Sequence, residues 1–269
     1  MNDRNKPKVV VLTGNEFRHK FFCNELRKLL HVNGVVSEAE PSESITSQLD
    51  NCVDEDILKH FKQRDEAEKC YFGDHASFDL LSSHVLEIGS NRVNSDDVFG
   101  WIQERKPEVL VLYGCGIIKE GILNAYAERI ANLHLGLSPY YRGSGTNFWA
   151  LVHEEPECVG GTILQPTSII DGGPILYQFR PKIMLGDRNH DLGCKTIIAG
   201  VPAISDVVNR IIRGKVKKRK QTDSGKYYQF NDFDADAVRK IWHLIDAGMI
   251  DQYIKNKEIR DKSFPLFEG

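Results

Sequence analysis

The stretch that decides the fold and the chemistry reads Asn132-Leu-His134-Leu-Gly-Leu-Ser-Pro139-Tyr-Tyr-Arg-Gly143. Its first residues alternate polar and apolar side chains, which is typical of a β-strand that runs into a loop. Asn132 and His134 are two positions apart, so their side chains point to the same face of such a strand. Pro139 and Gly143 predict a sharp turn that leaves both polar groups at the end of the strand.

A carboxylate follows in Asp171-Gly-Gly-Pro174, which begins 37 positions after His134. Together the three side chains suit acyl transfer to an amine. An amide and a protonated imidazole can both donate hydrogen bonds to a carbonyl oxygen that gains negative charge. The imidazole can also move a proton, and a carboxylate beside it keeps it charged and oriented or holds a water that relays the proton. Direct transfer of this kind requires no Ser or Cys nucleophile.

This pattern resembles that of the 10-formyltetrahydrofolate-dependent formyltransferases. Members of that family carry an Asn-x-His pair, then a Leu-Pro turn with a glycine shortly after it, and an Asp-x-Gly further along. The matching residues here are Asn132, His134, Ser138-Pro139, Gly143 and Asp171-Gly172-Gly173. The chain departs from the pattern at Gly136, where the family often has Ser, and at Ser138, where it usually has Leu. The resemblance covers residues 8–180.

The resemblance implies a role for each polar residue. Asn132 would stabilise the carbonyl oxygen, His134 would stabilise the tetrahedral intermediate and handle the proton, and Asp171 would set the charge and orientation of His134. Each residue taken alone has an ordinary structural explanation, since a histidine at a strand end is usually hydrogen-bonded and an Asp-Gly pair usually forms a turn. Their order and spacing together favour catalysis.

Composition limits the class of protein. The chain has 269 residues, of which 41% are hydrophobic and 27% charged, which suits one globular core with a small appendage. A net charge of -3 gives no overall attraction to nucleic acid or to an anionic membrane. The sequence has no apolar run long enough for a transmembrane helix and no signal peptide at its start, so we expect a cytoplasmic protein. The six cysteines form no metal-binding pattern and are expected to be reduced, and no metal is expected.

Strand and helix patterns alternate along the chain. A β-branched run at residues 8–12 precedes a helix with apolar residues at helical spacing. Further strands are predicted at residues 35–36, 85–88, 109–113, 161–165 and 174–177. A polar helix at residues 54–69 is expected on the surface, and another helix is expected at residues 96–106. The alternation predicts an α/β fold, a doubly wound, mostly parallel sheet in which ligands bind beyond the carboxyl ends of the strands.

Two loops at those strand ends are candidate binding segments. The first carries Gly14 and Asn15 and lacks a dinucleotide-binding fingerprint. The resemblance implies that it approaches the acceptor, although a plain β-to-α turn explains it equally well. Arg18 and His19 follow as candidate contacts for an anionic acceptor, and the alternative is that both are solvated.

The second loop contains Gly114, Cys115, Gly116, Ile117 and Ile118. The resemblance implies that its backbone binds the pterin ring of the folate. Two glycines permit close approach of a flat ring and two isoleucines offer apolar walls. The expected formyl transfer requires no thiol, so no catalytic role is expected for Cys115.

The end of the chain is less clearly patterned. We expect a catalytic domain at residues 1–212 and a small α/β extension at residues 213–269. The apolar pattern that begins at Asn189 contains Gly200 and Pro202, which predicts a kink or two abutting helices. A helix at residues 235–247 has an apolar stripe that packs on the core or on a second subunit, so a homodimer stays open.

The resemblance leads us to expect transfer of a formyl group from 10-formyltetrahydrofolate to a primary amine of a nucleotide-linked amino sugar, as in lipopolysaccharide or glycan biosynthesis. The acceptor contacts are expected from the residues beside the turn, namely Tyr140, Tyr141 and Arg142. Methionyl-tRNA and glycinamide ribonucleotide formyltransferases share the same core and are the enzyme alternatives. The segment after residue 212 is short for a tRNA-binding domain and long for the glycinamide ribonucleotide enzymes. A non-enzyme alternative is a nucleic-acid-binding protein that uses the basic residues 215–220, which are otherwise a solvated face.

Overall fold

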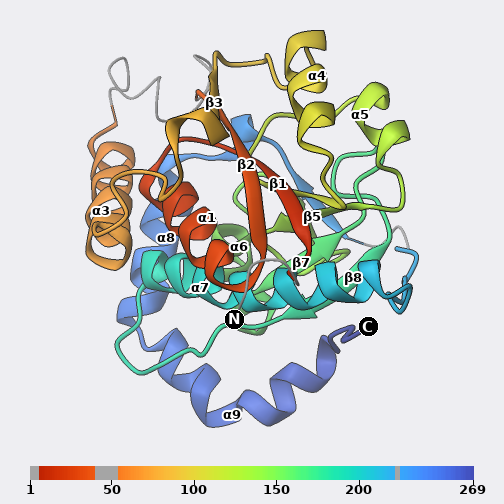
Figure 1. The fold of residues 1–269 in the computed structure, drawn as a ribbon. Coiled ribbons are helices and arrows are strands. Elements are labelled where there is room, and N and C mark those ends of the chain that lie inside the picture. The colour runs from red at the N-terminus through yellow and green to blue at the C-terminus, as the bar shows by residue number, and fades with distance from the viewer. Residues whose placement is uncertain (1–5, 40–53, 222–224) are drawn as a thin grey trace.

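The computed structural model describes residues 6–39, 54–221 and 225–269, and its centre is a seven-stranded sheet in the order β3-β2-β1-β4-β5-β7-β8 (Figure 1). The strands are β1 (Lys8–Thr13), β2 (His31–Glu38), β3 (Val85–Ile88), β4 (Val109–Tyr113), β5 (Ile130–His134), β7 (Gly161–Leu164) and β8 (Ile175–Phe179). The first five pair in parallel, whereas β7 and β8 are antiparallel to their neighbours. The predicted α/β fold with a mostly parallel sheet is confirmed.

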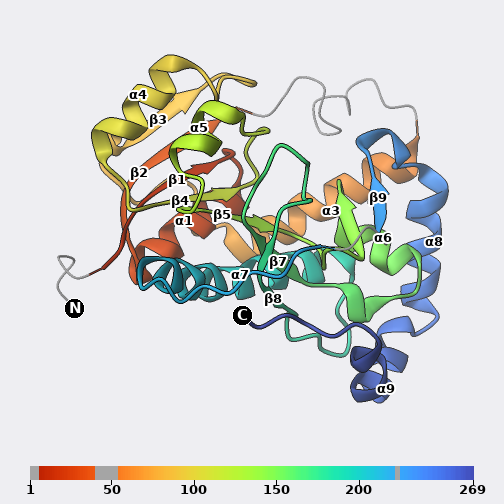
Figure 2. The ribbon, with the colours of Figure 1, turned by 90° about the vertical axis from the view of Figure 1, so that its right-hand side faces the viewer.

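Helices cover both faces of the sheet (Figure 2). They are α1 (Phe17–Leu29), α3 (Glu55–Phe72), α4 (Asp96–Arg105), α5 (Glu120–Ala125), α6 (Thr146–Val152), α7 (Asn189–Ile212), α8 (Ala235–Asp246) and α9 (Met249–Ser263). Single 3₁₀ turns are η3 (Ser82–His84), η4 (Pro156–Cys158) and η5 (Phe230–Asp232). A two-stranded sheet pairs β6 (Tyr141–Gly143) in parallel with β9 (Lys226–Tyr228).

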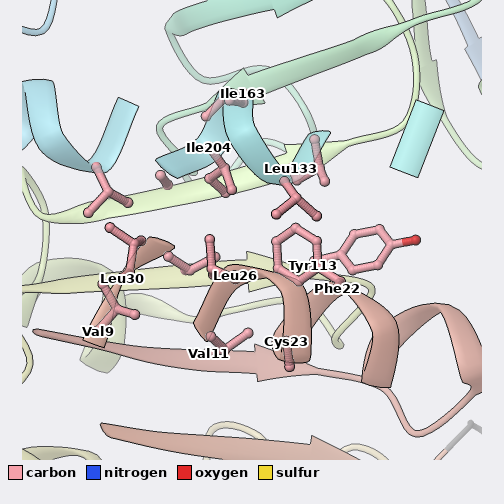
Figure 3. Packing of buried hydrophobic residues seen from close by; sticks show 14 of the residues in the cluster. Val9, Val11, Phe22, Cys23, Leu26, Leu30, Tyr113, Leu133, Ile163 and Ile204 are labelled. Atoms are coloured by element: carbon pink, nitrogen blue, oxygen red, sulfur yellow. The ribbon is translucent and has the colours of Figure 1, made fainter. Parts of the chain in front are cut away.

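The two faces of β1 belong to two different cores. Val9 and Val11 pack with α1 and α7, and Figure 3 shows this cluster closed by Leu133 of β5. Val10 and Leu12 point the other way and pack under α4 and α5. A strand alternates its side chains between faces, so burial on both sides requires a continuous apolar run. The run at residues 8–12 therefore identified a central strand.

The strand order reverses between β1 and β4. The chain moves outward from β1 through β2 to β3 and then returns to β4 on the other side of β1. In an open parallel sheet this reversal leaves a crevice beyond the carboxyl ends of the two strands. Gly14 follows β1 and Gly114 follows β4, so both predicted binding loops border this crevice.

Three helix predictions need correction or refinement. The helix predicted on the surface is α3, which buries His60, Phe61 and Phe72 and packs against α1, α7 and α8. The apolar pattern that begins at Asn189 forms one helix, α7, with Pro202 inside it. The alternative of two abutting helices was therefore wrong. The stripe of α8 packs within this chain, since Val238 and Ile241 are fully buried in the second core.

The C-terminal segment is packed into the rest of the chain. Ile241 and Tyr253 share the second core with Tyr141 and Trp149, which lie on the other side of the predicted boundary at residue 212. The strand β9 pairs with β6, directly after the predicted turn at Ser138-Pro139. The basic residues 215–220 form no helix, and Arg219 makes an antiparallel bridge to β8. None of the described helices is both long and apolar enough to cross a membrane.

Candidate active site

A cavity of about 750 Å³ lies in the crevice at the carboxyl ends of β1, β4 and β5. Many of the residues predicted from sequence line it, namely Gly14, Asn15, Gly114, Cys115, Gly116, Asn132 and His134. Residues far apart in sequence meet here because parallel strands end at the same edge of a sheet. The cavity is therefore the candidate active site.

The last parallel strand, β5, presents Asn132 and His134. It pairs in parallel with β4 and in antiparallel with β7, where His134 lies opposite Thr162. Two-residue spacing on a strand directs both polar side chains to the same side, as predicted. Asn132 is half-buried and His134 is 8% exposed, so both face the cavity with little access to bulk water.

The loop between β7 and β8 brings in Asp171. Its Oδ2 lies 3.4 Å from Nδ1 of His134 and accepts a hydrogen bond from the Gly143 N–H at 3.2 Å. Asp171 has a φ of 49°, in the left-handed region that disfavours side chains, and its carbonyl is held by Nε2 of Gln221 at 2.6 Å. Sequence reasoning missed Gln221, which lies 50 residues downstream.

The second nitrogen of His134 faces two acceptors. Its Nε2 lies 3.4 Å from the carbonyl of Tyr141 and 3.5 Å from Oγ1 of Thr146. The Thr146 hydroxyl donates its own proton to the carbonyl of Leu135. Acceptors therefore stand at both ring nitrogens of His134, with Asp171 at Nδ1 and Tyr141 and Thr146 at Nε2. Each nitrogen can donate a hydrogen bond only when it carries a proton.

The departure from the family pattern at Gly136 has a structural counterpart. A Cβ at this position would lie 2.3 Å from Oγ1 of Thr146 and 2.9 Å from Nε2 of His134. The space that a serine would need is therefore taken by Thr146, which supplies a hydroxyl beside the imidazole. Thr146 was not predicted, because no local pattern marks a residue 12 positions away from His134.

Two polar side chains hold the loop of residues 114–118. Glu38, which is buried at the end of β2, accepts from the Gly116 N–H at 2.8 Å and from two N–H groups of the turn before α4. Asn94 donates to the carbonyl of Ile117 at 2.8 Å and accepts from the Lys119 N–H at 2.7 Å. Neither residue was predicted, and both fix the backbone that faces the cavity.

The imidazole of His19 joins the two glycine loops. A Cβ on Gly14 would lie 2.5 Å from its Cε1, and a Cβ on Gly114 would lie 2.4 Å from its Nε2. Its Nδ1 accepts the Glu16 N–H at 3.1 Å. Burial, and then the charge of Arg18, lower the pKa of His19 well below its usual value. The ring predicted to bind an anion is thus neutral and packs between the loops.

Arg18 keeps the geometry of a ligand contact. Its guanidinium bonds to Glu68 at 2.7 Å and pairs with Glu16, and it lines the cavity.

Within the loop of residues 114–118, Ile117 is 62% exposed, whereas Ile118 is buried beneath α4 and α5 and cannot form a wall of a ligand site. Burial raises the pKa of Cys115 to about 12, which keeps its thiol protonated near neutral pH.

The residues of the turn are placed differently from expectation. The ring of Tyr141, predicted to contact the acceptor, is fully buried in the second core and its hydroxyl donates to Glu155. The ring of Tyr140 packs edge-on against Phe264 at 5.0 Å. Arg142 is half-buried, and in the described part of the chain its Nε has no hydrogen-bond partner. Of the three, Arg142 best keeps the features of a ligand contact.

No group of three or more His, Cys, Asp or Glu side chains within residues 6–39, 54–221 and 225–269 is placed to hold a metal ion.

Residues 9–208 match the family model described as formyl transferase. The chain belongs to the formyl transferase family. A methionyl-tRNA formyltransferase from Geobacter metallireducens is 27% identical over 166 residues, which are 61% of this chain and 51% of that protein. This chain therefore spans about half the length of the curated relative.

Solved structures with the same fold include one named as a sugar enzyme and one bound to a nucleotide-linked sugar. A sugar N-formyltransferase from a Shewanella species superposes with a TM-score of 0.54 at 17% identity, covering 84% of this chain and 78% of that one. The formyltransferase PseJ from Anoxybacillus kamchatkensis, in complex with UDP-4,6-dideoxy-4-formamido-L-AltNAc and tetrahydrofolate, gives 0.50 at 15% identity. The shared regions are 87% of this chain and 97% of that one. At identities this low, the superpositions show a common fold and no more than that.

Proposed function

We propose that this protein transfers a formyl group from 10-formyltetrahydrofolate to the primary amine of a nucleotide-linked amino sugar. The observation that carries the proposal is the contact between His134 and Asp171, with Asn132 on the same face of β5, in the crevice of a formyl transferase fold. The sugar-linked acceptor is supported by the folds of the Shewanella enzyme and of PseJ.

The proposed chemistry is a direct displacement at the formyl carbon. The amine nitrogen bonds to that carbon, negative charge develops on the oxygen, and the bond from the carbon to the folate nitrogen then breaks. Asn132 and His134 donate hydrogen bonds to the oxygen as its charge grows. The amine loses one proton and the folate nitrogen gains one, and we assign this proton transfer to His134. Asp171 holds the ring by its other nitrogen.

The formyl donor is assigned to the Gly114 side of the cavity. Gly114 has a φ of 63° and is exposed, so bare backbone faces the cavity there. Glu38 and Asn94 fix the loop that follows. Fixed backbone donors and acceptors beside the exposed Ile117 fit a flat, polar-edged heterocycle. The donor supplies the formyl group at a position within reach of Asn132 and His134.

The test is a substrate comparison with purified protein and 10-formyltetrahydrofolate. Amino-sugar nucleotides, charged initiator methionyl-tRNA and glycinamide ribonucleotide are offered separately, and formylated product is quantified by mass spectrometry. We expect turnover with at least one amino-sugar nucleotide and none with the other two. Turnover confined to the tRNA or to glycinamide ribonucleotide would replace the proposed acceptor while the catalytic residues stayed the same.

A further inference from the structure

A second cavity of about 370 Å³ adjoins the catalytic one. The two share Arg18, Leu135 and Ser144 as lining residues, so a single ligand can extend from one into the other. The second cavity includes none of the loop of residues 114–118. It therefore adjoins the active site away from the proposed donor loop.

Aromatic rings form the walls of this second cavity. His60 and Phe61 come from α3, Phe148 comes from α6, and Phe233 comes from the C-terminal segment. The His60 ring lies 5.4 Å from that of Phe148 and 5.3 Å from that of Phe233, and the latter two are 5.0 Å apart. Planar walls of this kind favour a flat ring over a sugar or an aliphatic chain.

Three polar side chains of the second cavity carry no charge and each has an atom without a hydrogen-bond partner among the described residues, beside the charged Arg18, Arg64 and Glu68. The rings of His60 and His190 are 4.5 Å apart, and burial lowers the pKa of His60 to about 3 and that of His190 to about 4. Within the described ranges, Nδ1 of His60, Nε2 of His190 and Nδ2 of Asn147 lack hydrogen-bond partners. Buried polar groups without partners are costly, so three together require an explanation.

The Arg18 guanidinium lies where the two cavities meet, beside the carboxylates of Glu16 and Glu68. Arg18 lines both, and Glu68 holds its guanidinium through a bond of 2.7 Å. A guanidinium carries five N–H donors, so its bonds to Glu68 and Glu16 leave donors for an anionic ligand. A ligand that spanned both cavities would therefore meet the aromatic rings, then Arg18, then His134.

We propose that the second cavity binds the nucleobase of the acceptor, with His60, His190 and Asn147 as hydrogen-bonding partners of its polar edge and Arg18 as the phosphate contact. This inference rests on the proposed function, because it assigns part of the same acceptor to a place in the fold. It makes His60 and His190 specificity-determining residues and gives the C-terminal segment, through Phe233, a part in substrate binding.

The experiment measures binding of nucleoside monophosphates by calorimetry, in parallel with 5-formyltetrahydrofolate as a donor analogue. His60→Phe and His190→Phe keep a ring of similar size and remove the nitrogen atoms, and His243→Phe on the exposed face of α8 is the matched control. We expect at least one monophosphate to bind, and each cavity variant to weaken that binding about tenfold, which corresponds to one lost hydrogen bond. The control variant and binding of the folate analogue should be unchanged.

Wild-type kinetics provide a second measurement that does not depend on the variants folding. The monophosphate that binds should inhibit competitively against the acceptor and not against the donor. Absence of monophosphate binding, or binding unaffected by folded cavity variants, overturns the inference while formyl transfer to an amino-sugar nucleotide still supports the proposed function. Weakened binding of the folate analogue instead would assign the cavity to the pterin ring and also overturn it.

Discussion

The two walls of the catalytic cavity are built in opposite ways. The wall formed by β5 and the β7–β8 loop presents side chains, namely Asn132, His134 and Asp171. The wall formed by the ends of β1 and β4 contains the backbone of Gly14 and Gly114, with the ring of His19 packed between them. The first wall suits chemistry, which needs particular functional groups, and the second suits the binding of a flat ring, which needs an open, fixed surface.

The difference explains why sequence patterns predict the residues of the first wall better than those of the second. Side chains that act must be particular residue types at fixed spacing, so they leave a pattern. A backbone surface requires only that side chains be missing, and its shape is set by distant residues such as Glu38, which bonds to Gly116 across 78 positions. Changes to the first wall should lower turnover, and changes to the second should weaken donor binding.

The largest effect is expected on the side-chain wall. His134→Ala and Asn132→Ala each remove a donor to the developing oxygen charge and should lower kcat roughly 100- to 1,000-fold. The KM for the donor should change little, because the backbone wall is intact. Steady-state kinetics on variants shown by circular dichroism to be folded provide the measurement. Near-normal turnover in folded His134→Ala would refute the mechanism.

Asp171→Asn tests the same wall more finely, because it removes the charge of the side chain and keeps its shape. The carboxylate lies 3.4 Å from Nδ1 of His134 and accepts the Gly143 N–H, so its loss should loosen the ring and the turn beside it. A hydrogen bond to a charged group contributes about 1.5–3 kcal/mol, so kcat should fall roughly 10- to 100-fold. Steady-state kinetics on the folded variant provide the measurement. An unchanged kcat would remove Asp171 from this role.

Gly114→Ala tests the backbone wall. The φ of 63° disfavours any side chain, and the new Cβ would lie 2.4 Å from Nε2 of His19. We expect a stability loss of about 1–2 kcal/mol and a higher KM for the donor, with kcat less affected. Gly121→Ala on α5 is the matched control, since nothing lies within 4 Å of its Cβ position and alanine favours a helix. Equal effects of the two substitutions would contradict a fixed backbone wall.

Glu38→Gln makes a smaller change to that wall. One oxygen becomes an NH₂ group, which cannot accept from the N–H groups that Glu38 now binds. The KM for the donor should rise several-fold, in keeping with about 1 kcal/mol for one such bond, while kcat is retained. Glu87→Gln on the exposed side of β3 is the control. A fall in kcat at constant donor KM would show that Glu38 acts on the catalytic wall instead.

The smallest effect is expected far from both walls. Lys217, Lys218 and Lys220 are exposed, and the side chain of Lys218 pairs with Glu128. Replacing all three with Gln should leave formyl transfer to an amino-sugar nucleotide within twofold of wild type, roughly the scale of loss of exposed ion pairs. Binding of charged tRNA with a steep salt dependence that these replacements flatten would favour the tRNA acceptor instead.

Sequence alone determined the sheet and marked the side chains that we propose to be catalytic. The apolar run at residues 8–12 is continuous because β1 is buried on both faces. Asn132 and His134 share a face because side chains alternate along a strand. Both are consequences of local geometry. The prediction that α3 lies on the surface was wrong. The buried face of this helix is short and partly polar, and only contact with α1, α7 and α8 buries it.

The tertiary structure decided what surrounds those side chains. Thr146 reaches His134 because Gly136 leaves room for it, and Gln221 holds the Asp171 loop from 50 residues away. The rings of His60 and His190 meet only because α3 packs on α7. Such contacts depend on which segments pack together, and the residues involved carry no shared pattern along the chain. Spacing in sequence encodes direction within one element, whereas proximity between elements is set by the packing of the whole core.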